Sequence, residues 1–243
     1  MLFLEQDGSM LAFFCPCVHT DRQTEQVQAS FWTALSSIRL PGEPGRFSRS
    51  ATQGLLAMQE NYLIVVDVQN DFVSGSLGTP EARAIVPALC AKVRDFQGTV
   101  LLTRDTHYAD YLTTQEGRLL PIVHCVEGTE GWQLVPELEE VCQARNLRIF
   151  DKETFASVAL ASELAERAKK GEVAGVEFAG LCTDICVISN ALLLKSMAPQ
   201  IPLFVDPACC AGTTPERHEA ALKVLHSCQI LPGSRKEAGH VPV

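Results

Sequence analysis

Five short runs of mostly apolar residues recur along the chain and predict the strands of one sheet. Parallel strands that are covered on both faces show such nearly continuous apolar runs. The runs are YLIVVDV (62–68), TVLLTR (99–104), LRIF (147–150), VAGVEFAG (173–180) and PLFVD (202–206). We therefore predict a parallel sheet whose strands are buried on both sides.

Helical patterns separate these runs. Pro80 stands at the first position of one expected helix, residues 157–171 carry apolar spacing and stop at a glycine, and residues 184–197 and 215–226 are similar. Alternating strands and helices favour an α/β fold, a three-layer α/β/α sandwich with right-handed crossovers. In such sheets a ligand binds beyond the carboxyl ends of the strands.

Polar residues that follow the apolar runs are therefore the candidates for a site. They are Asp67, Asp105 with His107, Lys152 and the segment Cys182 to Cys186. A carboxylate at the end of a buried run, such as Asp67, needs a hydrogen bond or an ion pair. Taken singly, Asp67 can equally be a helix cap and Lys152 a solvated surface charge.

The first 57 residues show no repeat and no sustained hydrophobic period, whereas strand and helix signals are dense after Asn61. A boundary is predicted near Met58, with residues 1–57 as an N-terminal extension and residues 58–243 as one folded domain. The extension can be genuine sequence, a partner-binding arm, or upstream sequence translated from a start codon chosen too early. The last interpretation is favoured, because Met58 stands just before the first strand.

Composition and charge exclude several classes of partner. The chain has 243 residues, of which 47% are hydrophobic and 20% charged, so it is expected to fold. The formal net charge is −9, without a basic run, which argues against nucleic acid and anionic membranes. No stretch approaches the roughly 20 apolar residues of a membrane span, and Glu5 and Asp7 stand where a signal peptide is positive. We expect a cytoplasmic protein.

The cysteines are expected to be reduced. There are ten of them, too few for a disulfide scaffold and without the paired Cys-x-x-Cys spacing of a structural zinc site. Cys182 and Cys186 lie four residues apart, and Cys209 and Cys210 are adjacent.

Cys186 is the candidate nucleophile. The segment GLCTDICV (180–187) places it in the first turn of an expected helix directly after a strand, where the helix dipole favours a thiolate. Because a free thiol has a pKa of about 8.5, a base and a cation nearby would be needed as well. Asp67 and Lys152 can supply them. The alternative is that Cys186 is one more small, buried core residue.

A second cluster beyond the strand ends has the composition of a metal site. TRDTHY (103–108) places Asp105 and His107 two residues apart on one side of an extended segment, and His124 follows. Two histidines and a carboxylate can hold a divalent metal, although surface His and Asp also occur together without one.

In combination and in this order, VVDVQNDF (65–72), the region around Lys152 with Phe155 and Ser157 behind it, and GLCTDICV resemble the isochorismatase-like cysteine hydrolases. Within that family the closest resemblance is to the nicotinamidase-type amidases, and it covers about residues 61–232. It implies a six-stranded parallel sheet and an amide-hydrolysing enzyme that forms a thioester.

The same resemblance assigns roles to residues of this chain. Asp67 would be the general base, Lys152 would orient and stabilise the charged site, and Cys186 would be the nucleophile. A cis peptide is implied at Leu181–Cys182, with the backbone N–H groups of Cys182 and Cys186 forming the oxyanion hole. Cys182 stands where the family commonly has alanine.

For the second cluster, the resemblance implies one zinc, iron or manganese ion at Asp105, His107 and His124. The pyridine nitrogen of the substrate would complete the coordination shell, and Glu116 matches the place of a fourth protein ligand in some members. Phe72 is the expected aromatic residue of the substrate pocket. Pro121 departs from the pattern, because an aromatic residue is common at that place.

Three functions stay open from the sequence. The first is hydrolysis of nicotinamide, or a close pyridine carboxamide, to the acid and ammonia. The second keeps Asp67, Lys152 and Cys186 but acts on a carbamoyl, ureido or other small amide, with the Asp105 cluster serving only as structure. The third is a thiol redox protein that uses Cys182 and Cys186. The small-molecule amide would be the partner, and the family commonly forms homo-oligomers.

Overall fold

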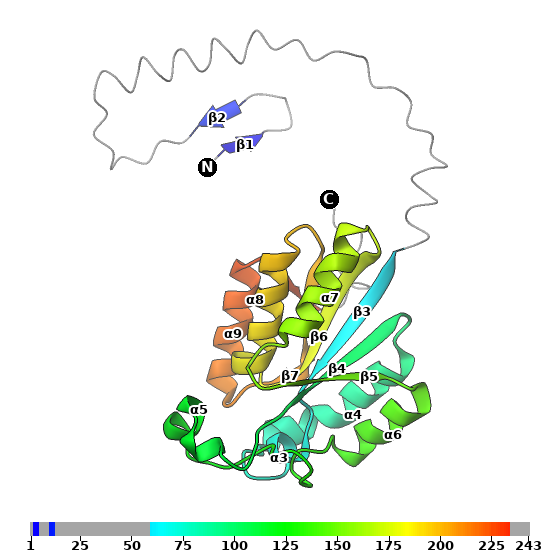
Figure 1. Cartoon of the computed structure of the whole chain (residues 1–243). Coiled ribbons are helices and arrows are strands. Elements are labelled where there is room, and N and C mark those ends of the chain that lie inside the picture. The colour runs from blue at the N-terminus through cyan, green and yellow to red at the C-terminus, as the bar shows by residue number, and fades with distance from the viewer. Residues whose placement is uncertain (1, 5–9, 13–58, 234–243) are drawn as a thin grey trace, which may run out of the picture. The chain divides into compact units, whose positions relative to one another are not determined.

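The computed structural model describes residues 2–4, 10–12 and 59–233, and the last of these ranges is built around one open parallel sheet (Figure 1). Its strands are β3 (Glu60–Val66), β4 (Thr99–Asp105), β5 (Arg148–Lys152), β6 (Val173–Leu181), β7 (Leu203–Ala211) and β8 (Ile230–Pro232). They are arranged in the order β5-β4-β3-β6-β7-β8, and every neighbouring pair is parallel. The α/β fold predicted from the sequence is confirmed.

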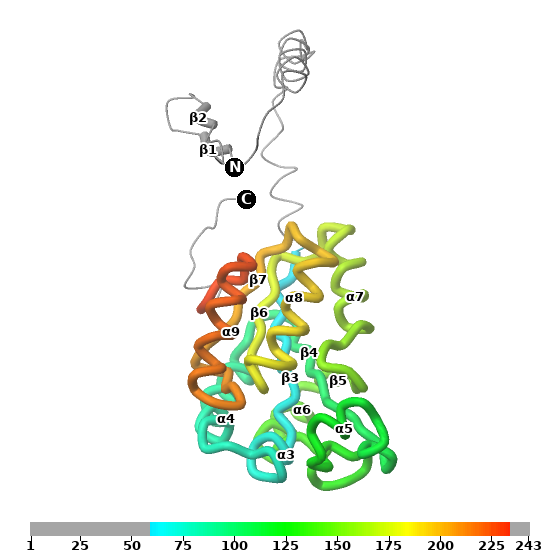
Figure 2. The backbone as a smooth tube through the Cα atoms, turned by 90° about the vertical axis from the view of Figure 1, so that its left-hand side faces the viewer, coloured from blue at the N-terminus to red at the C-terminus, as the bar shows by residue number. Residues whose placement is uncertain are grey.

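Helices cover both faces of the sheet (Figures 1 and 2). On one face α4 (Pro80–Asp95) and α6 (Pro136–Arg145) pack on the strands through residues such as Leu89 and Leu138. The other face is covered by α7 (Val158–Lys169), α8 (Ile188–Met197) and α9 (Pro215–Ser227), which bury residues such as Leu164, Leu194 and Leu225. The two cores that result are separated by the sheet, as in any three-layer sandwich.

The starts of three helices follow from local sequence. The side chains of Thr79, Ser157 and Thr214 each accept a hydrogen bond from the backbone N–H three residues later, which satisfies a donor that the first helical turn leaves unpaired. Pro80 and Pro215 then occupy the first helical position, where the missing N–H costs nothing.

The segment 184–197 is not the single helix that the sequence predicts. A π-helical turn, η2 (Thr183–Val187), comes first, and α8 begins only at Ile188. Such turns are frequent at functional sites, and this one carries Cys186. The sequence patterns do not predict four other short elements, which are α3 (Asn70–Val73), η1 (Tyr111–Thr113), α5 (Gln115–Leu119) and β8. Each is too short for a periodic pattern. Helix α6 was also missed, because few of its residues are apolar.

The N-terminal part forms a separate compact unit, Met1–Ser48, in which β1 (Leu2–Leu4) pairs antiparallel with β2 (Met10–Ala12). The sequence predicts no element there. The remainder of residues 1–57 lies outside the described residues, so their interpretation as an extension stays a prediction. In the part of the chain that the structure describes, no helix has both the length and the apolar character that crossing a membrane requires.

The order of the strands indicates where on the sheet a ligand would bind. The chain runs from β3 outward to β4 and β5, and then returns to β6 on the other side of β3. This reversal is the switch point at which open α/β sheets bind ligands, beyond the carboxyl ends of the strands.

Candidate active site

Three side chains converge at the switch point. Asp67 follows β3 directly, Lys152 is the last residue of β5, and Cys186 lies in η2 after β6. The Lys152 Nζ atom lies 2.7 Å from Asp67 Oδ2 and 3.6 Å from Cys186 Sγ. All three side chains are buried. The structure thus brings together the residues that the sequence singled out.

The backbone of Asp67 is held in an unusual conformation. Its φ of 49° lies in the left-handed region, which is rare for residues other than glycine. Two groups of Thr103 hold it there: the backbone oxygen accepts from the Asp67 N–H at 3.2 Å, and Oγ1 donates to Asp67 Oδ1 at 2.7 Å. Strained residues that the surroundings fix in this way cluster at functional sites. The second carboxylate oxygen, Oδ2, receives no hydrogen bond of good geometry from the described residues.

A close approach of two strands supports this arrangement. Gly180, in β6, has a φ of 117°, and a Cβ atom there would lie 2.2 Å from the backbone oxygen of Val66. Only glycine therefore allows β6 to pass the end of β3 just before Asp67.

Burial keeps the Cys186 thiol protonated at rest. Removal from water raises its pKa well above the ordinary value, and the Asp67 carboxylate raises it further, while Lys152 acts in the opposite direction. This outweighs the helix dipole that the sequence suggested would favour a thiolate. Burial also raises the pKa of Asp67, although the Lys152 charge opposes it. For Lys152, burial alone would lower the pKa, but the carboxylates of Asp67 and Asp105 raise it, so the ammonium stays charged.

Beside this cluster lies the group of possible metal ligands. One ligand atom each from Asp105, His107 and His124 lies within 4.8 Å of the others, and all three residues are buried. Asp105 Oδ2 is 3.0 Å from His107 Nε2 and 3.8 Å from His124 Nε2. The His107 Nε2 atom is buried without a hydrogen-bond partner among the described residues. An orphaned nitrogen that faces a carboxylate and a second imidazole fits a divalent metal.

The surroundings orient these ligands. His124 Nδ1 lies 2.8 Å from the backbone oxygen of Ile122, which leaves its Nε2 for the cluster. Glu116 Oε1 is 3.7 Å from His107 Nε2, so this carboxylate lies at the rim of the cluster. The Phe72 ring packs edge-on against His124, with 5.5 Å between centroids, whereas Pro121 is exposed.

Two residues that the sequence analysis left without a role hold the cluster in place. Gln69 is fully buried and forms hydrogen bonds with both backbone groups of Asp105. Its Nε2 donates to the backbone oxygen at 2.8 Å, and its Oε1 accepts from the backbone N–H at 2.7 Å. Asp71 Oδ2 accepts the N–H of Cys125, next to His124, at 2.8 Å. Both belong to the motif VVDVQNDF, and that motif was the one signal that could have revealed them.

Residues of α9 and of the loop that precedes α9 hold the turn before Cys186 in place. The Leu181–Cys182 peptide is cis, as the resemblance implied. Thr183 Oγ1 lies 2.8 Å from His218 Nδ1, and the carboxylate of Asp184 accepts both the N–H and the hydroxyl of Thr213. The Cys182 side chain itself is only half-buried.

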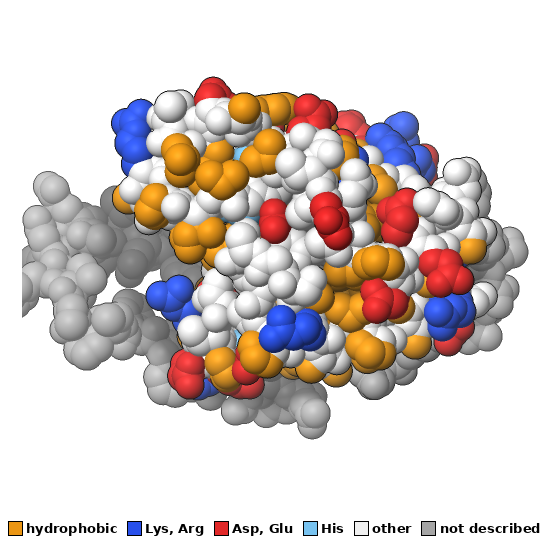
Figure 3. All heavy atoms as spheres, turned by 90° about the horizontal axis from the view of Figure 1, so that it is seen from below, with side chains coloured by type: hydrophobic (Ala, Val, Ile, Leu, Met, Phe, Trp, Pro, Cys, Tyr) orange, Lys and Arg blue, Asp and Glu red, His pale blue; other side chains and the backbone are white. Residues whose placement is uncertain are grey.

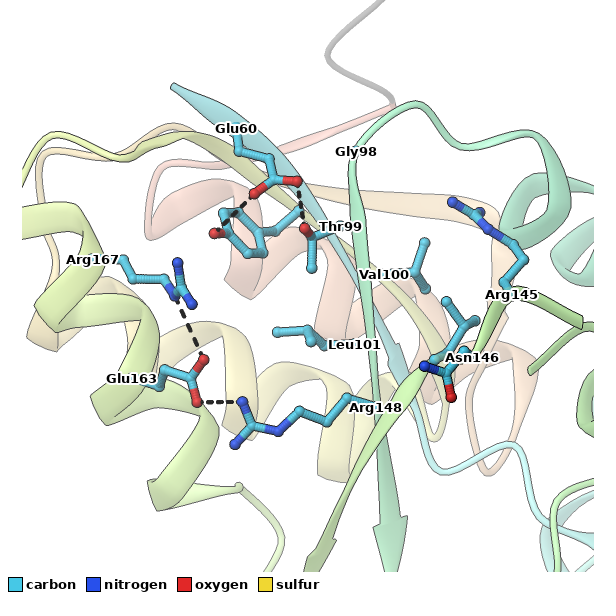
Figure 4. Close-up of a pocket in the computed structure, with 12 residues that line it drawn as sticks. Glu60, Gly98, Thr99, Val100, Leu101, Arg145, Asn146, Arg148, Glu163 and Arg167 are labelled. Atoms are coloured by element: carbon cyan, nitrogen blue, oxygen red, sulfur yellow. Dashed lines mark hydrogen bonds and ion pairs between the residues drawn. The ribbon is translucent and has the colours of Figure 1, made fainter. Parts of the chain in front are cut away.

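A cavity of about 390 Å³ lies at the opposite end of the sheet (Figure 4). Its lining includes Glu60, Thr99 and Arg148, the first residues of β3, β4 and β5. Glu163 pairs there with both Arg148 and Arg167, at 2.7 and 3.5 Å. The amino ends of the strands are remote from the buried clusters, so the candidate site is the one at the carboxyl ends. Figure 3 shows hydrophobic side chains among charged ones on the face at that end of the sheet.

Comparisons with known proteins agree with this geometry. Residues 61–234 match the model of the isochorismatase domain. A nicotinamidase of Saccharomyces cerevisiae is 32% identical over 120 residues, which are 37% of this chain and 55% of that protein. The chain thus spans about half the length of that relative. A nicotinamidase of Schizosaccharomyces pombe is 29% identical over 210 residues, which are 72% of this chain and 93% of that protein.

Solved structures give the same picture. The nicotinamidase/pyrazinamidase PncA of Bacillus subtilis superposes with a TM-score of 0.63 at 29% identity, over 72% of this chain and all of that one. The pyrazinamidase of Pyrococcus horikoshii, solved in complex with zinc, gives a TM-score of 0.61 at 28% identity, over 72% of this chain and 99% of that one.

Proposed function

Because the chain belongs to the isochorismatase family, we propose that it is a cysteine amidohydrolase that converts nicotinamide to nicotinate and ammonia. The observation that carries the proposal is the contact between two clusters: Lys152 touches Asp105 at 2.9 Å as well as Asp67 and Cys186. A nucleophile with its base and cation therefore lies next to a set of ligands for the metal that would bind a pyridine ring. The nicotinamidases among the relatives and solved structures support this substrate.

In the first step Cys186 attacks the carboxamide carbon. Its thiol is protonated at rest, so the proton passes to Asp67 as the sulfur–carbon bond forms. Oδ2 is the oxygen that Thr103 leaves free and that faces the Lys152 ammonium. The Lys152 ammonium stays charged and stabilises the thiolate that develops. Negative charge on the carbonyl oxygen would be held by the backbone N–H groups of Cys182 and Cys186.

Three further proton transfers complete the reaction. Asp67 returns its proton to the amide nitrogen, the carbon–nitrogen bond breaks, and ammonia leaves a thioester on Cys186. Asp67 then takes a proton from water, whose oxygen attacks the thioester carbon. The collapse of this second intermediate releases nicotinic acid, which ionises to nicotinate by giving its proton to the solvent or to the ammonia, and the proton on Asp67 returns to the sulfur.

Asp105, His107 and His124 would hold one divalent transition metal, which we propose to be zinc. The two imidazole nitrogens and the carboxylate that these residues offer are ligands that zinc commonly takes, and the Pyrococcus horikoshii pyrazinamidase was solved with zinc. When bound, the metal supplies an electrophilic position that binds the pyridine nitrogen and so orients the ring. Glu116 at the rim is the candidate for a further ligand, and Phe72 beside His124 is the candidate wall of the ring pocket.

The test is release of ammonia by purified protein from a panel of nicotinamide, pyrazinamide and ureido compounds. Turnover of nicotinamide that the Cys186→Ala variant lacks would support the proposal. Turnover confined to the ureido compounds would replace the substrate but keep the roles of Asp67, Lys152 and Cys186. We also propose that residues 58–243 suffice for activity, since the family match begins at residue 61.

A further inference from the structure

Asn190, on α8, makes three hydrogen bonds that no assigned role explains, two of them buried and the third partly buried. Its Nδ2 donates to the backbone oxygen of Cys186 at 2.8 Å and to that of Phe155 at 3.1 Å. Its Oδ1 accepts the backbone N–H of Ser157 at 2.9 Å. The Asn190 side chain is only 2% exposed.

These bonds join the two segments that supply the nucleophile and its cation. Cys186 lies one helical turn before Asn190. Phe155 and Ser157 belong to the loop that leaves β5 directly after Lys152, and Ser157 starts α7. A single side chain therefore spans from the backbone of the nucleophile to the segment that follows Lys152.

The position demands an amide. Two carbonyl oxygens and one N–H group meet there, and only Asn or Gln offers two donors and an acceptor in one planar group. An aspartate would face both carbonyls with an oxygen. A serine can bond the carbonyl four residues earlier in its own helix, but it is too short to reach the loop as well.

We propose that Asn190 is a positioning residue that fixes Cys186 relative to Lys152, an inference that rests on the proposed function of the site. It touches no reacting atom. It sets the separation of sulfur and ammonium, at present 3.6 Å, by tying the two backbone segments together. Displacements of about 1 Å at a reacting group can cost about 100-fold in rate.

The test uses Asn190→Ser, which keeps the bond to Cys186 and loses the bridge to the loop. We expect kcat for nicotinamide to fall about 10- to 100-fold, with KM changed less than about threefold. The matched control is Leu194→Val, one turn further along α8 in the same core, which should lower thermal stability and leave kcat unchanged. Should Asn190→Ser fail to fold, Asn190→Ala removes all three bonds without burying a new polar group and is expected to show the same loss of kcat.

A double-mutant cycle with Lys152→Met shows whether Asn190 acts through Lys152. If it does, Asn190→Ser costs little further in that background. Full additivity, or an unchanged kcat in folded Asn190→Ser protein, would overturn the proposal. If wild-type protein does not hydrolyse nicotinamide, the proposed function is wrong, but the positioning role of Asn190 can still be tested. The same cycle is then measured by alkylation of Cys186 with iodoacetamide, where coupling to Lys152 supports the proposal and its absence rejects it.

Discussion

Lys152 Nζ lies 2.9 Å from Oδ1 of Asp105, while the other oxygen of Asp105 faces His107 and His124. One carboxylate is thus shared by the cluster of Asp67, Lys152 and Cys186 and by the group of proposed metal ligands. Burial opposes ionisation of Asp105, but the neighbouring His107 imidazole and the Lys152 charge lower its pKa, so it stays an anion. A substitution in either cluster is therefore expected to alter the geometry and charge of the other through Asp105.

The two cysteines of the segment 182–186 should differ completely in importance. Cys186→Ala removes the proposed nucleophile, and ammonia release should fall by about a thousandfold or more. Cys182→Ala keeps the backbone N–H assigned to the oxyanion hole and should retain most of the rate. Equal, deep losses in both variants would instead favour the redox function that needs both thiols.

Removal of the base should be nearly as damaging as removal of the nucleophile. Asp67→Asn is expected to lower kcat by about 10²- to 10⁴-fold, and combining it with Lys152→Ala should cost less than the product of the single effects, because the groups act as a unit. Asp151→Asn, at the half-exposed neighbour of Lys152, is the control and should be near normal. A near-normal rate for Asp67→Asn would exclude it as the base.

The pH dependence of the wild-type rate follows from the same residue. Asp67 must be ionised to accept a proton, and burial raises its pKa. Activity should therefore be lost as the pH falls, with a midpoint above the ordinary value of about 4 for aspartate. The measurement is kcat/KM for nicotinamide against pH. A midpoint at or below 4 would contradict the assignment.

Strands β3 to β7, helices α4, α7 and α9, most of α8, and the clustering of Asp67, Lys152 and Cys186 could be predicted from the sequence. Buried apolar runs have a strong pattern, and the ends of parallel strands meet at one edge of the sheet. The contacts of Gln69 and Asn190 could not be predicted, because an isolated amide has no periodic signal and its partners are backbone groups distant in sequence. The π-helical turn at Cys186 could not be predicted either, because the apolar spacing of its five residues does not differ from that of an α-helix.

Gly180 should be irreplaceable for steric reasons. In Gly180→Ala the new Cβ would meet the Val66 oxygen at 2.2 Å, and we expect about 3 kcal/mol of lost stability together with lower activity, because β3 carries Asp67. Gly128→Ala is the matched control: its φ of 78° is also positive, but no atom lies within 4 Å of its Cβ. That variant should lose only about 1 kcal/mol. Chemical denaturation measures both, and equal losses would refute the steric explanation.

Lys92, which contacts both Glu177 and Asp206, should stabilise the fold over a defined pH window. Burial would raise the pKa of Asp206, but Lys92 lowers it, so this contribution is lost as the pH falls below about 4. Burial would lower the pKa of Lys92, but the two carboxylates raise it, so its contribution is lost only above about pH 10. Lys92→Met should cost about 2 kcal/mol at pH 7 and less at pH 3. Lys223→Met, at an exposed position, is the control for denaturation at both pH values.

The metal separates hydrolysis of nicotinamide from the ureido alternative. If Asp105, His107 and His124 bind an ion, purified protein should contain about one transition-metal ion per chain by elemental analysis. Its proposed role is to orient the ring rather than to generate the nucleophile. Chelation should therefore raise KM for nicotinamide, by about 10- to 100-fold, much more than it slows the reaction of Cys186 with small activated substrates. His107→Ala should reproduce the chelated enzyme, whereas His226→Ala, at an exposed position, should not. Active protein without metal, or an unchanged KM in His107→Ala, would refute the metal's role and favour a ureido or other small amide as the substrate.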